Sequence, residues 1–401
     1  MKNHSVVMLG LGYIGLPTAA LIASKKIKVL GIDVKKDVVS TINQGKIHIV
    51  EPDLDGLVAK VVKEKWLTAS TDVSPADTYI ITVPTPVRDN NQPDISYVES
   101  ATRSIIPYLQ DGNLLIIEST SPVGTTEKMQ EIIYTERPEL KDKIHLAYCP
   151  ERVLPGNIIY ELEHNDRAIG GIDAVSTRKA IDFYRQFVKG DLYPTNARTA
   201  EMVKLVENSS RDVQIAFANE LSIISDKAGI NVWELIELAN KHPRVNILRP
   251  GTGVGGHCIA VDPWFIVSAF QKEAKLIRTA REINNYKTEW VIEKIKNAAL
   301  QFEIENKKKP LIAAMGLAFK PDIDDLRESP SLYVARSLKM QGFQVVAVEP
   351  NINNSDEFEL LPLQEALKKA DIIAFLVGHK EFRKTGDLHK KVVLDFVNVN
   401  S

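Results

Sequence analysis

Cysteine is scarce in this chain of 401 residues, which has only Cys149 and Cys258. Two cysteines are too few for a disulfide framework and fit a reducing compartment, so we expect a cytoplasmic protein in which either thiol could be reactive. An excess of one charge is also lacking: 50 basic and 52 acidic residues give a formal net charge of -2, which argues against nucleic acid as a partner. Apolar runs of transmembrane length and a signal-peptide cleavage pattern are missing as well, so we expect neither membrane insertion nor secretion.

What remains is the composition of a globular protein, with 44% hydrophobic residues over a length that permits two or three domains. Short apolar runs alternate with amphipathic segments in the first third, which predicts βαβ units and a parallel sheet. Helical periodicity from Glu201 to Gly229, and from about Ala269 to Gln301, predicts a helical middle with a long helix, after which strands return. We therefore predict an α/β chain with two Rossmann-like, doubly wound domains, residues 1–198 and 305–401, joined by a central helical domain, residues 199–304.

A glycine-rich sequence follows the first predicted strand and opens an apolar helix. Its pattern, G-x-G-x-x-G, provides the tight turn and the close backbone approach that a pyrophosphate needs at a helix N-terminus. Asp33 ends the second strand 18 residues after the last glycine, where a carboxylate can bind an adenosine ribose and repels a 2′-phosphate. A glycine turn without a ligand is the alternative, and we predict NAD as the cofactor. The predicted contacts are Gly10, Gly12, Tyr13, Ile14, Gly15 and Asp33.

Hydroxyl side chains lie where two further predicted strands end, which is where dinucleotides lie in open α/β sheets. Thr85 follows one strand, and Ser119 and Thr120 follow the next. We predict cofactor contacts for all three, although hydroxyls at strand ends are often only caps. Thr125 and Thr126 are instead predicted to cap the helix that starts there.

Lys204 and Asn208 are four residues apart in the first long helix, so they share one of its faces. Both are hydrogen-bond donors on a rigid element and could hold a developing oxyanion. The alternative is the solvated face of a surface helix.

The segment from Arg249 to Phe265 contains four glycines within six residues, at 251, 253, 255 and 256, and then Cys258. We expect these glycines to let a nucleotide phosphate and a carbonyl substrate approach the thiol. A reactive cysteine needs a positive group nearby, and the alternative for Cys258 alone is a packing role. His257 has no second pair of ligands at a suitable spacing, so no metal site is predicted. Asp262 could position a water.

Six motifs in this order resemble the nucleotide-sugar 6-dehydrogenases of the UDP-glucose dehydrogenase superfamily, over nearly the whole chain. They are the glycine turn with Asp33, STSPVGTT (119–126), CPERVLPG (149–156), AEMVKLVEN (200–208), PGTGVGGHCIAVD (250–262) and FKPDIDDLRESP (319–330). The resemblance implies a four-electron oxidation of a sugar C6 alcohol to a carboxylate, with two NAD used in succession at one site. It also implies that the product serves the biosynthesis of a surface polysaccharide or glycan.

The same resemblance implies that Cys258 is the nucleophile. An aldehyde can release a second hydride only after a nucleophile such as this thiol adds to it, and the resulting thioester is then hydrolysed. Lys204 and Asn208 would stabilise the oxyanions. Asp262 with a water would assist proton transfer, and Glu151 would assist the hydrolysis. For Glu151 the alternative is an ordinary surface acid at a strand end.

The resemblance further implies that Arg244 reaches the substrate site of a neighbouring subunit, which predicts a homodimer with the long middle helices as its interface. Lys320 and Arg327 would grip UDP, because arginine matches phosphate through bidentate hydrogen bonds. Their alternative is a solvated loop charge. The substrate-binding residues implied in this way are Arg152, Leu154, Arg211, Arg244, Gly255, Gly256, Phe319, Lys320 and Arg327.

Within the family, the segment 242–265 most resembles the UDP-N-acetyl-D-mannosamine dehydrogenases. Ala260 and Val261 stand where UDP-glucose dehydrogenases carry a proline and a lysine. Oxidation of UDP-N-acetylglucosamine or UDP-glucose is the alternative. Two alternatives belong to other functional classes. One is a two-electron NAD dehydrogenase, which would not need Cys258, and the other is a non-catalytic regulator that binds NAD or a nucleotide sugar.

Overall fold

The computed structural model describes residues 5–88, 91–154, 156–256, 258–386 and 388–399. The chain divides into two compact units, Met1–Glu207 and Asn208–Ser401. Within the described residues, no helix is both long and apolar enough to cross a membrane.

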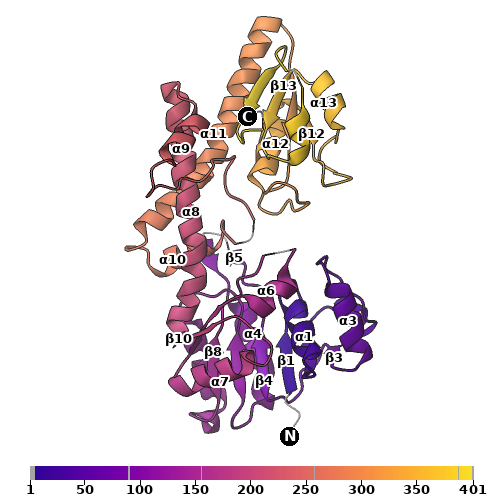
Figure 1. The fold of residues 1–401 in the computed structure, drawn as a ribbon, viewed down its shortest axis with the longest axis vertical. Coiled ribbons are helices and arrows are strands. Elements are labelled where there is room, and N and C mark those ends of the chain that lie inside the picture. The colour runs from indigo at the N-terminus through magenta and orange to yellow at the C-terminus, as the bar shows by residue number, and fades with distance from the viewer. Residues whose placement is uncertain (1–4, 89–90, 155, 257, 387, 400–401) are drawn as a thin grey trace. The chain divides into compact units, whose positions relative to one another are not determined.

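The first unit is built on an eight-stranded sheet (Figure 1). In sheet order its strands are β10 (Leu192–Asn196), β9 (Arg167–Gly171), β8 (His145–Tyr148), β7 (Leu114–Ile117), β4 (Thr78–Ile81), β1 (Ser5–Leu9), β2 (Lys28–Ile32) and β3 (Leu67–Ser70). Neighbouring strands are parallel except β8 and β9, which pair antiparallel. The order from β3 to β8 reverses direction between β1 and β4, as in the dinucleotide-binding fold, so ligands are expected at the carboxyl ends of these two strands.

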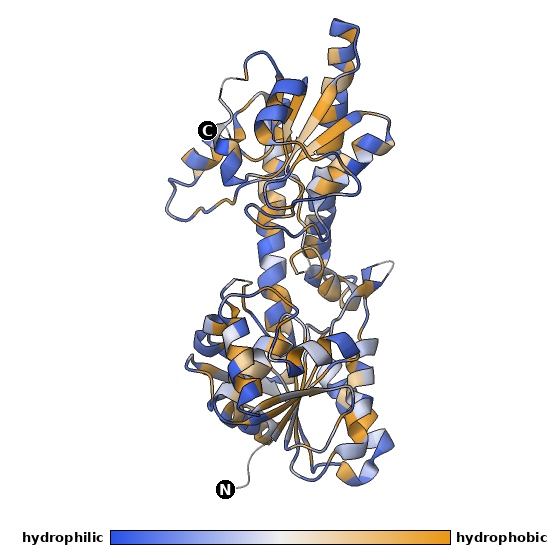
Figure 2. Cartoon of the chain, turned by 90° about the vertical axis from the view of Figure 1, so that its right-hand side faces the viewer, coloured by the Kyte–Doolittle hydropathy of each residue, from blue (hydrophilic) through white to orange (hydrophobic). Residues whose placement is uncertain are grey.

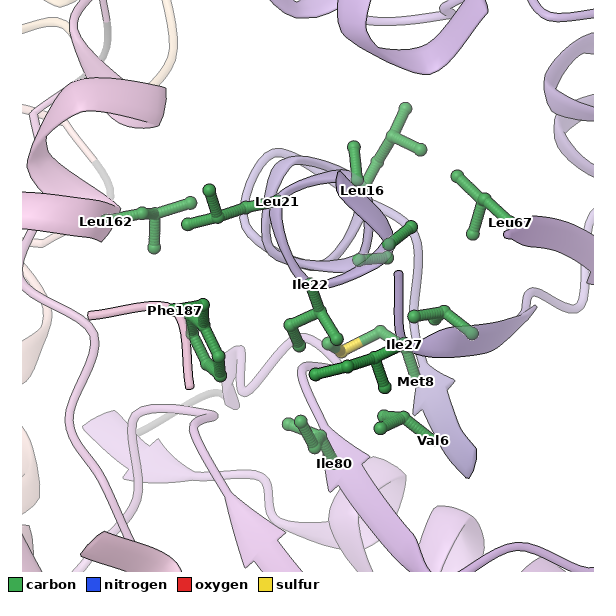
Figure 3. Close-up of a cluster of buried hydrophobic side chains, with 14 of the residues drawn as sticks. Val6, Met8, Leu16, Leu21, Ile22, Ile27, Leu67, Ile80, Leu162 and Phe187 are labelled. Atoms are coloured by element: carbon green, nitrogen blue, oxygen red, sulfur yellow. The ribbon is translucent and has the colours of Figure 1, made fainter. Parts of the chain in front are cut away.

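Helices cover both faces of this sheet because successive strand residues point to opposite sides. Val6 and Met8 of β1 pack into one buried cluster with α1, and Val7 and Leu9 pack into another on the opposite face. Figure 3 shows the first cluster, where Ile22 points from the helix toward Met8. The helices are α1 (Gly15–Ser24), α2 (Lys36–Asn43), α3 (Leu54–Lys63), α4 (Ser96–Ile105), α5 (Thr125–Glu136), α6 (Ile158–His164) and α7 (Ala174–Tyr184). A separate two-stranded antiparallel ribbon consists of β5 (Val87–Arg88) and β6 (Gln92–Pro93).

The middle of the chain is helical, as predicted. Its helices are α8 (Ala197–Ala228), α9 (Val232–Ala239), α10 (Asp262–Ala269) and α11 (Lys275–Asn306). Gly229 follows α8 with φ +70°, a left-handed conformation that suits glycine at a helix end. The second long helix starts later than predicted, because a tight turn separates it from α10: the N–H groups of Glu273 and Ala274 both donate to the carbonyl of Phe270.

Buried polar groups join α11 to the part of α8 that belongs to the second unit. Arg281 donates to Asp212 at 2.6 Å, and Asn219 donates to Asn284 at 2.8 Å. The side-chain oxygen of Asn219 also accepts the N–H of Gly251 at 2.9 Å. These contacts anchor the start of the glycine segment to the helix pair.

The last domain contains a four-stranded, fully parallel sheet. Its order is β12 (Gln344–Val348), β11 (Leu311–Met315), β13 (Ile372–Phe375) and β14 (Val392–Asp395), and its own helices are α12 (Pro330–Met340) and α13 (Leu363–Lys369). Val291 and Ile295 of α11 pack with Ile312 on one face of this sheet. Figure 2 shows the hydrophobic strands of both sheets running between helices with hydrophilic outer faces. The predicted class, two doubly wound α/β domains with a helical centre, is confirmed.

Candidate functional site

The glycine turn after β1 contains glycines that serve two different purposes. Gly10 has φ +94°, and a Cβ there would lie 2.8 Å from the carbonyl oxygen of Thr82. A Cβ on Gly15 would lie 1.9 Å from the carbonyl oxygen of Gly10. The fold itself therefore requires these two glycines. At Gly12, in contrast, a Cβ would meet no atom within 4 Å, so its missing side chain leaves room for a ligand.

Asp33 follows β2 and is hydrogen-bonded to the backbone of the glycine turn. Its carboxylate accepts the N–H of Leu11 at 3.2 Å and the N–H of Lys35 at 2.9 Å. The side chain is only half-buried, so its remaining lone pairs can accept ribose hydroxyls. Tyr13, which is 46% exposed, and the half-buried Ile14 complete the turn. These residues fit NAD.

The hydroxyls at the next strand ends are not equivalent. Ser119 is buried, and its Oγ donates to the carbonyl of Val83 at 2.7 Å, so its proton is used inside the protein. Thr85 and Thr120 are half-buried and follow neighbouring strands. They are better placed than Ser119 to offer a hydroxyl to a ligand.

The prediction that Thr125 and Thr126 cap α5 is wrong. Neither side chain forms a capping hydrogen bond, and the N-cap residue is Gly124. The buried carboxylate of Glu201, from α8, accepts the N–H of Gly124 at 2.6 Å and the N–H of Thr126 at 2.8 Å. An acid 75 residues away satisfies the first turn, and the charge is favourable at a helix N-terminus.

Lys204 and Glu151 meet in the first unit. Lys204 donates from Nζ to the backbone carbonyl of Glu151 at 2.7 Å. The Glu151 side chain is 7% exposed and accepts the N–H of Val153 at 2.7 Å. Burial raises the pKa of Glu151, while the positive charges of Lys204 and Arg167 oppose that rise. Glu151 is therefore no surface acid, and the solvated reading of Lys204 is also wrong.

A buried polar cluster that sequence reasoning missed lies next to Glu151. Arg167 approaches the Cys149 sulfur with Nη1 at 3.8 Å and stacks over the Tyr184 ring at 5.2 Å. Tyr184 donates to Glu118 at 2.5 Å. Burial raises the pKa of Glu118 and brings that of Cys149 to about 11, which makes Cys149 a poor nucleophile. Glu118, Arg167 and Tyr184 come from β7, β9 and α7 or the residues next to them, far apart in sequence, so no local spacing in the sequence indicated the cluster.

The next two predicted substrate contacts lie just beyond Glu151. Arg152 forms an ion pair with Glu207 at 2.5 Å and also donates to the carbonyl of Asp166. Leu154 is 65% exposed, and its N–H donates to Glu161 at 2.8 Å. Both residues remain within reach of solvent.

In the second unit, three of the predicted catalytic residues lie around the start of α10. Asn208 donates to the carboxylate of Asp262 at 2.5 Å, and Asp262 is buried. The N–H of Asp262 donates to the carbonyl of Cys258 at 2.8 Å. Cys258 itself is exposed, so the alternative of a buried packing cysteine is excluded. An accessible thiol can add to a carbonyl, and the backbone of this cysteine is tied to the buried acid that Asn208 contacts.

The glycine segment before Cys258 packs against the loop that follows β11. A Cβ on Gly255 would lie 2.3 Å from the carbonyl oxygen of Glu328, and one on Gly256 would lie 2.9 Å from the Phe319 ring. We expected these glycines to make room for ligands. In the structure, the first effect of Gly255 and Gly256 is to let the segment lie against the loop after β11, whereas a Cβ on Gly251 would meet no atom within 4 Å.

The remaining predicted residues are charged and exposed. Lys320 and Arg327 lie in that loop, and Arg327 pairs with Asp325 at 2.6 Å. Arg211 lies on α8, and Arg244 lies in the segment before the glycines. His257 lies outside the described residues.

Sequence models of the UDP-glucose/GDP-mannose dehydrogenase family match three stretches of the chain. They are its NAD binding domain at residues 4–188, its central domain at 198–286 and its UDP binding domain at 313–401.

Individual relatives match nearly the whole chain. A UDP-N-acetyl-D-mannosamine dehydrogenase of Campylobacter jejuni is 54% identical over 94% of this chain and 96% of its own length. An NDP-N-acetyl-D-galactosaminuronic acid dehydrogenase of Ralstonia nicotianae is 51% identical over 98% and 95%. The solved UDP-D-ManNAc dehydrogenase of Pyrococcus horikoshii has a TM-score of 0.87 at 37% identity, covering 99% of this chain and 96% of that one. Since the three domains match in order and the glycine turn fits the cofactor, the chain belongs to the UDP-glucose/GDP-mannose dehydrogenase family and is an NAD-dependent oxidoreductase of UDP-sugars.

Proposed function

We propose that the protein oxidises the C6 hydroxyl of UDP-N-acetyl-D-mannosamine to the carboxylate of UDP-N-acetyl-D-mannosaminuronate, through a covalent intermediate on Cys258. One alcohol, one water and two NAD⁺ become one carboxylate, two NADH and three protons. The observation that carries the covalent step is the exposure of Cys258 beside the hydrogen-bonded pair of Asn208 and Asp262.

NAD, when bound, accepts the hydride of each oxidation. Between the two oxidations, the Cys258 thiolate adds to C6 of the aldehyde, a C–S bond forms, and the carbonyl electron pair moves to oxygen. Loss of hydride from C6 re-forms the C=O bond as a thioester. Water then adds, the C–S bond breaks, and the thiolate leaves.

The neighbouring side chains supply charge and protons. Lys204 uses one N–H on the Glu151 carbonyl and Asn208 uses one on Asp262, which leaves further donors on both for the oxyanions. Asp262 orients a water. Glu151 takes a proton from the hydrolytic water, and a carboxylate whose pKa is raised by burial suits a general base.

The other contacts and domain roles belong to the same proposal. Residues 1–198 bind NAD, 199–304 supply the catalytic lysine and cysteine, and 305–401 bind UDP. The matched family domains support this division. Cofactor contacts are Gly10, Gly12, Tyr13, Ile14, Gly15, Asp33, Thr85, Ser119 and Thr120, and substrate contacts are Arg152, Leu154, Arg211, Arg244, Gly255, Gly256, Phe319, Lys320 and Arg327.

The configuration of the sugar has two candidates. The Campylobacter jejuni relative supports the manno configuration. The Ralstonia nicotianae relative, named for an N-acetylgalactosaminuronic acid, supports an N-acetylated galacto sugar as the second candidate.

We also propose a cytoplasmic homodimer in which Arg244 reaches the partner's substrate. Large apolar side chains are exposed on the middle helices, including Phe217 at 51%, Ile224 at 55% and Leu238 at 63%. Phe217 and Ile224 are seven residues apart on α8, so they share a face that a second copy can cover.

The experiment is to measure NADH formed per mole of limiting UDP-sugar, with UDP-N-acetylmannosamine, UDP-N-acetylgalactosamine, UDP-N-acetylglucosamine and UDP-glucose in parallel. Two NADH from the manno sugar alone are expected. One NADH would refute the covalent route, and turnover of another sugar alone would refute the substrate assignment. Cys258→Ser should lower turnover by about a thousandfold or more, with Cys149→Ser as the matched control for an internal thiol.

A further inference from the structure

The loop after β11 carries Phe319 and Lys320, and a buried acid holds its first residues. Glu349 follows β12, and its side chain is fully buried. Its Oε2 accepts the N–H of Leu317 at 2.7 Å and the N–H of Ala318 at 2.9 Å. Burial alone would raise the pKa of Glu349, but the hydrogen bonds from His379, Leu317 and Ala318 outweigh it and lower that pKa. An ionised acid thus fixes the start of the loop.

A buried histidine holds the other end of the same stretch. His379 follows β13, and its Nδ1 accepts the N–H of Asp322 at 3.0 Å. Because a backbone N–H can only donate, Nδ1 is the acceptor and the proton of the neutral ring belongs on Nε2. Nε2 lies 3.1 Å from Oε2 of Glu349. The two side chains therefore form one brace from Leu317 to Asp322.

Asp322 needs this support. It has φ +61°, a left-handed conformation that is uncommon for a residue with a Cβ. Besides the bond to His379, its carboxylate accepts the N–H of Lys380 at 3.1 Å. Without the histidine, we expect the loop to relax and Lys320 to lose its fixed place.

A metal site is the other reading of this corner. Asp322, His379 and Glu381 each bring one ligand atom within 4.8 Å of the others. The Nδ1 lone pair of His379, however, already accepts the N–H of Asp322. The hydrogen bonding favours a brace over a metal ligand.

The braced loop also contacts the segment that leads to the thiol. A Cβ on Gly256 would lie 2.9 Å from the Phe319 ring, and a Cβ on Gly255 would lie 2.9 Å from the Cβ of Phe319. Gly256 precedes Cys258 by two residues. Cores and loops that pack this closely move together, so the position of Phe319 bears on the position of Cys258.

We propose that His379 is a positioning residue: braced on Glu349, it sets the loop 317–322 so that UDP binding at Lys320 is transmitted through Phe319 to the segment that carries Cys258. This inference rests on the proposed function, because it assumes that the loop binds UDP.

The test compares the full-length wild type with His379→Asn and His379→Gln. Asparagine keeps an acceptor near the Nδ1 position and gives up the bond to Glu349. Glutamine keeps a donor near the Nε2 position and gives up the bond to Asp322. His389→Asn, an exposed histidine of the same domain, is the matched control. We would measure the Kd of UDP and of NAD by calorimetry, KM and kcat for the UDP-sugar, and thermal unfolding.

Both variants should bind UDP about tenfold more weakly and show a similarly raised KM for the UDP-sugar. Asparagine leaves the buried Glu349 without its hydrogen bond, and glutamine leaves the N–H of Asp322 without its acceptor. The Kd of NAD should stay at the wild-type value. A lower unfolding temperature with an unchanged Kd for UDP would mean a purely structural role and overturn the proposal. If the wild type itself does not bind UDP, the proposed function is wrong, and the inference about His379 falls with it.

Alkylation of Cys258 by iodoacetamide gives a readout independent of turnover. In the wild type, saturating UDP should change the alkylation rate by about threefold or more. In Phe319→Ala, at a UDP concentration that saturates the variant by its own measured Kd, UDP should leave the alkylation rate unchanged. The same rate change in both proteins would overturn the proposed link through Phe319.

Discussion

The first strand of each α/β domain ends in the same glycine turn, but the two turns lead into different loops. Gly10 has φ +94° and Gly316 has φ +96°. Their N–H groups donate to the carbonyls of Ile32 and Val348, each at 2.8 Å. After Gly10, helix α1 begins within five residues, whereas after Gly316 a long loop precedes α12 at Pro330.

The acid that follows the second strand differs in the same way. Asp33 is half-buried and holds one N–H of its turn, Leu11, so it can still accept a ribose hydroxyl. Glu349 is fully buried and accepts two turn N–H groups together with the bond to His379. The same fold therefore provides a cofactor site where the acid after the second strand stays accessible. It provides a support for a loop where the corresponding acid is buried and its carboxylate is fully used in hydrogen bonds within the protein.

The largest expected effect comes from separating the glycines. Gly12→Val should lower kcat/KM for NAD by about a hundredfold or more while leaving the unfolding temperature near that of the wild type, because only ligand space is lost. Gly15→Val should prevent folding, because its Cβ would overlap the Gly10 carbonyl. Steady-state kinetics and calorimetry distinguish the two; equal destabilisation by both would contradict the comparison.

The acids provide the second test. Asp33→Asn should raise the KM for NAD about tenfold with little change in stability, because the acid is accessible. Glu349→Gln should lower the free energy of unfolding by about 1–3 kcal/mol, because a saturated buried acceptor is lost. Urea unfolding and KM values for both substrates would be measured. The opposite pattern would mean that the two acids do not differ in role.

The third prediction concerns the buried cation next to Glu151. Removing the Arg167 charge should raise the pKa of Glu151 further, so less of it is ionised at neutral pH. The acidic limb of the kcat profile should then move to higher pH in Arg167→Met, and stay near the wild-type position in Arg167→Lys. If Arg167→Met alone is unstable, the double variant Glu118→Gln/Arg167→Met replaces it. This variant removes the acid together with the cation, so no unpaired charge stays buried in the cluster. A uniform loss of kcat at every pH would reject the prediction.

The last prediction concerns stability alone, with no expected effect on activity, and involves a buried cation of the second unit. Burial lowers the pKa of Lys287 to about 7, and its Nζ donates to the Ser222 hydroxyl at 2.7 Å. The folded state binds fewer protons than the unfolded chain between pH 7 and the ordinary lysine pKa, so this group makes stability rise with pH across that window. Relative to Lys287→Met, the wild type should gain roughly 1–4 kcal/mol from pH 7 to pH 10. Urea unfolding at four pH values checks this; parallel curves would contradict it.

The apolar runs VVMLG, TYIITVP and DIIAFLVGH predict buried strands, and they contain β1, β4 and β13, which are buried on both faces. Sequence reasoning missed β3 and β10, which lie at the two edges of the first sheet and carry polar residues or a proline. It also missed β9, which begins with an arginine and ends with two glycines. It identified Glu151 only through the family resemblance. Arg167 and the Glu201 cap were missed because their partners are remote in sequence.

The sequence by itself determined the domain order and the cofactor turn with its acid, since these depend on local spacing and chemistry. Through the family resemblance it also named the candidate catalytic residues. Only the tertiary structure decided that Gly12 leaves room for a ligand while Gly256 lies against Phe319. It also decided that Asp33 stays accessible while Glu349 is buried under a histidine. The physical reason is that space, burial and pKa depend on the neighbours that the fold brings together from distant parts of the chain.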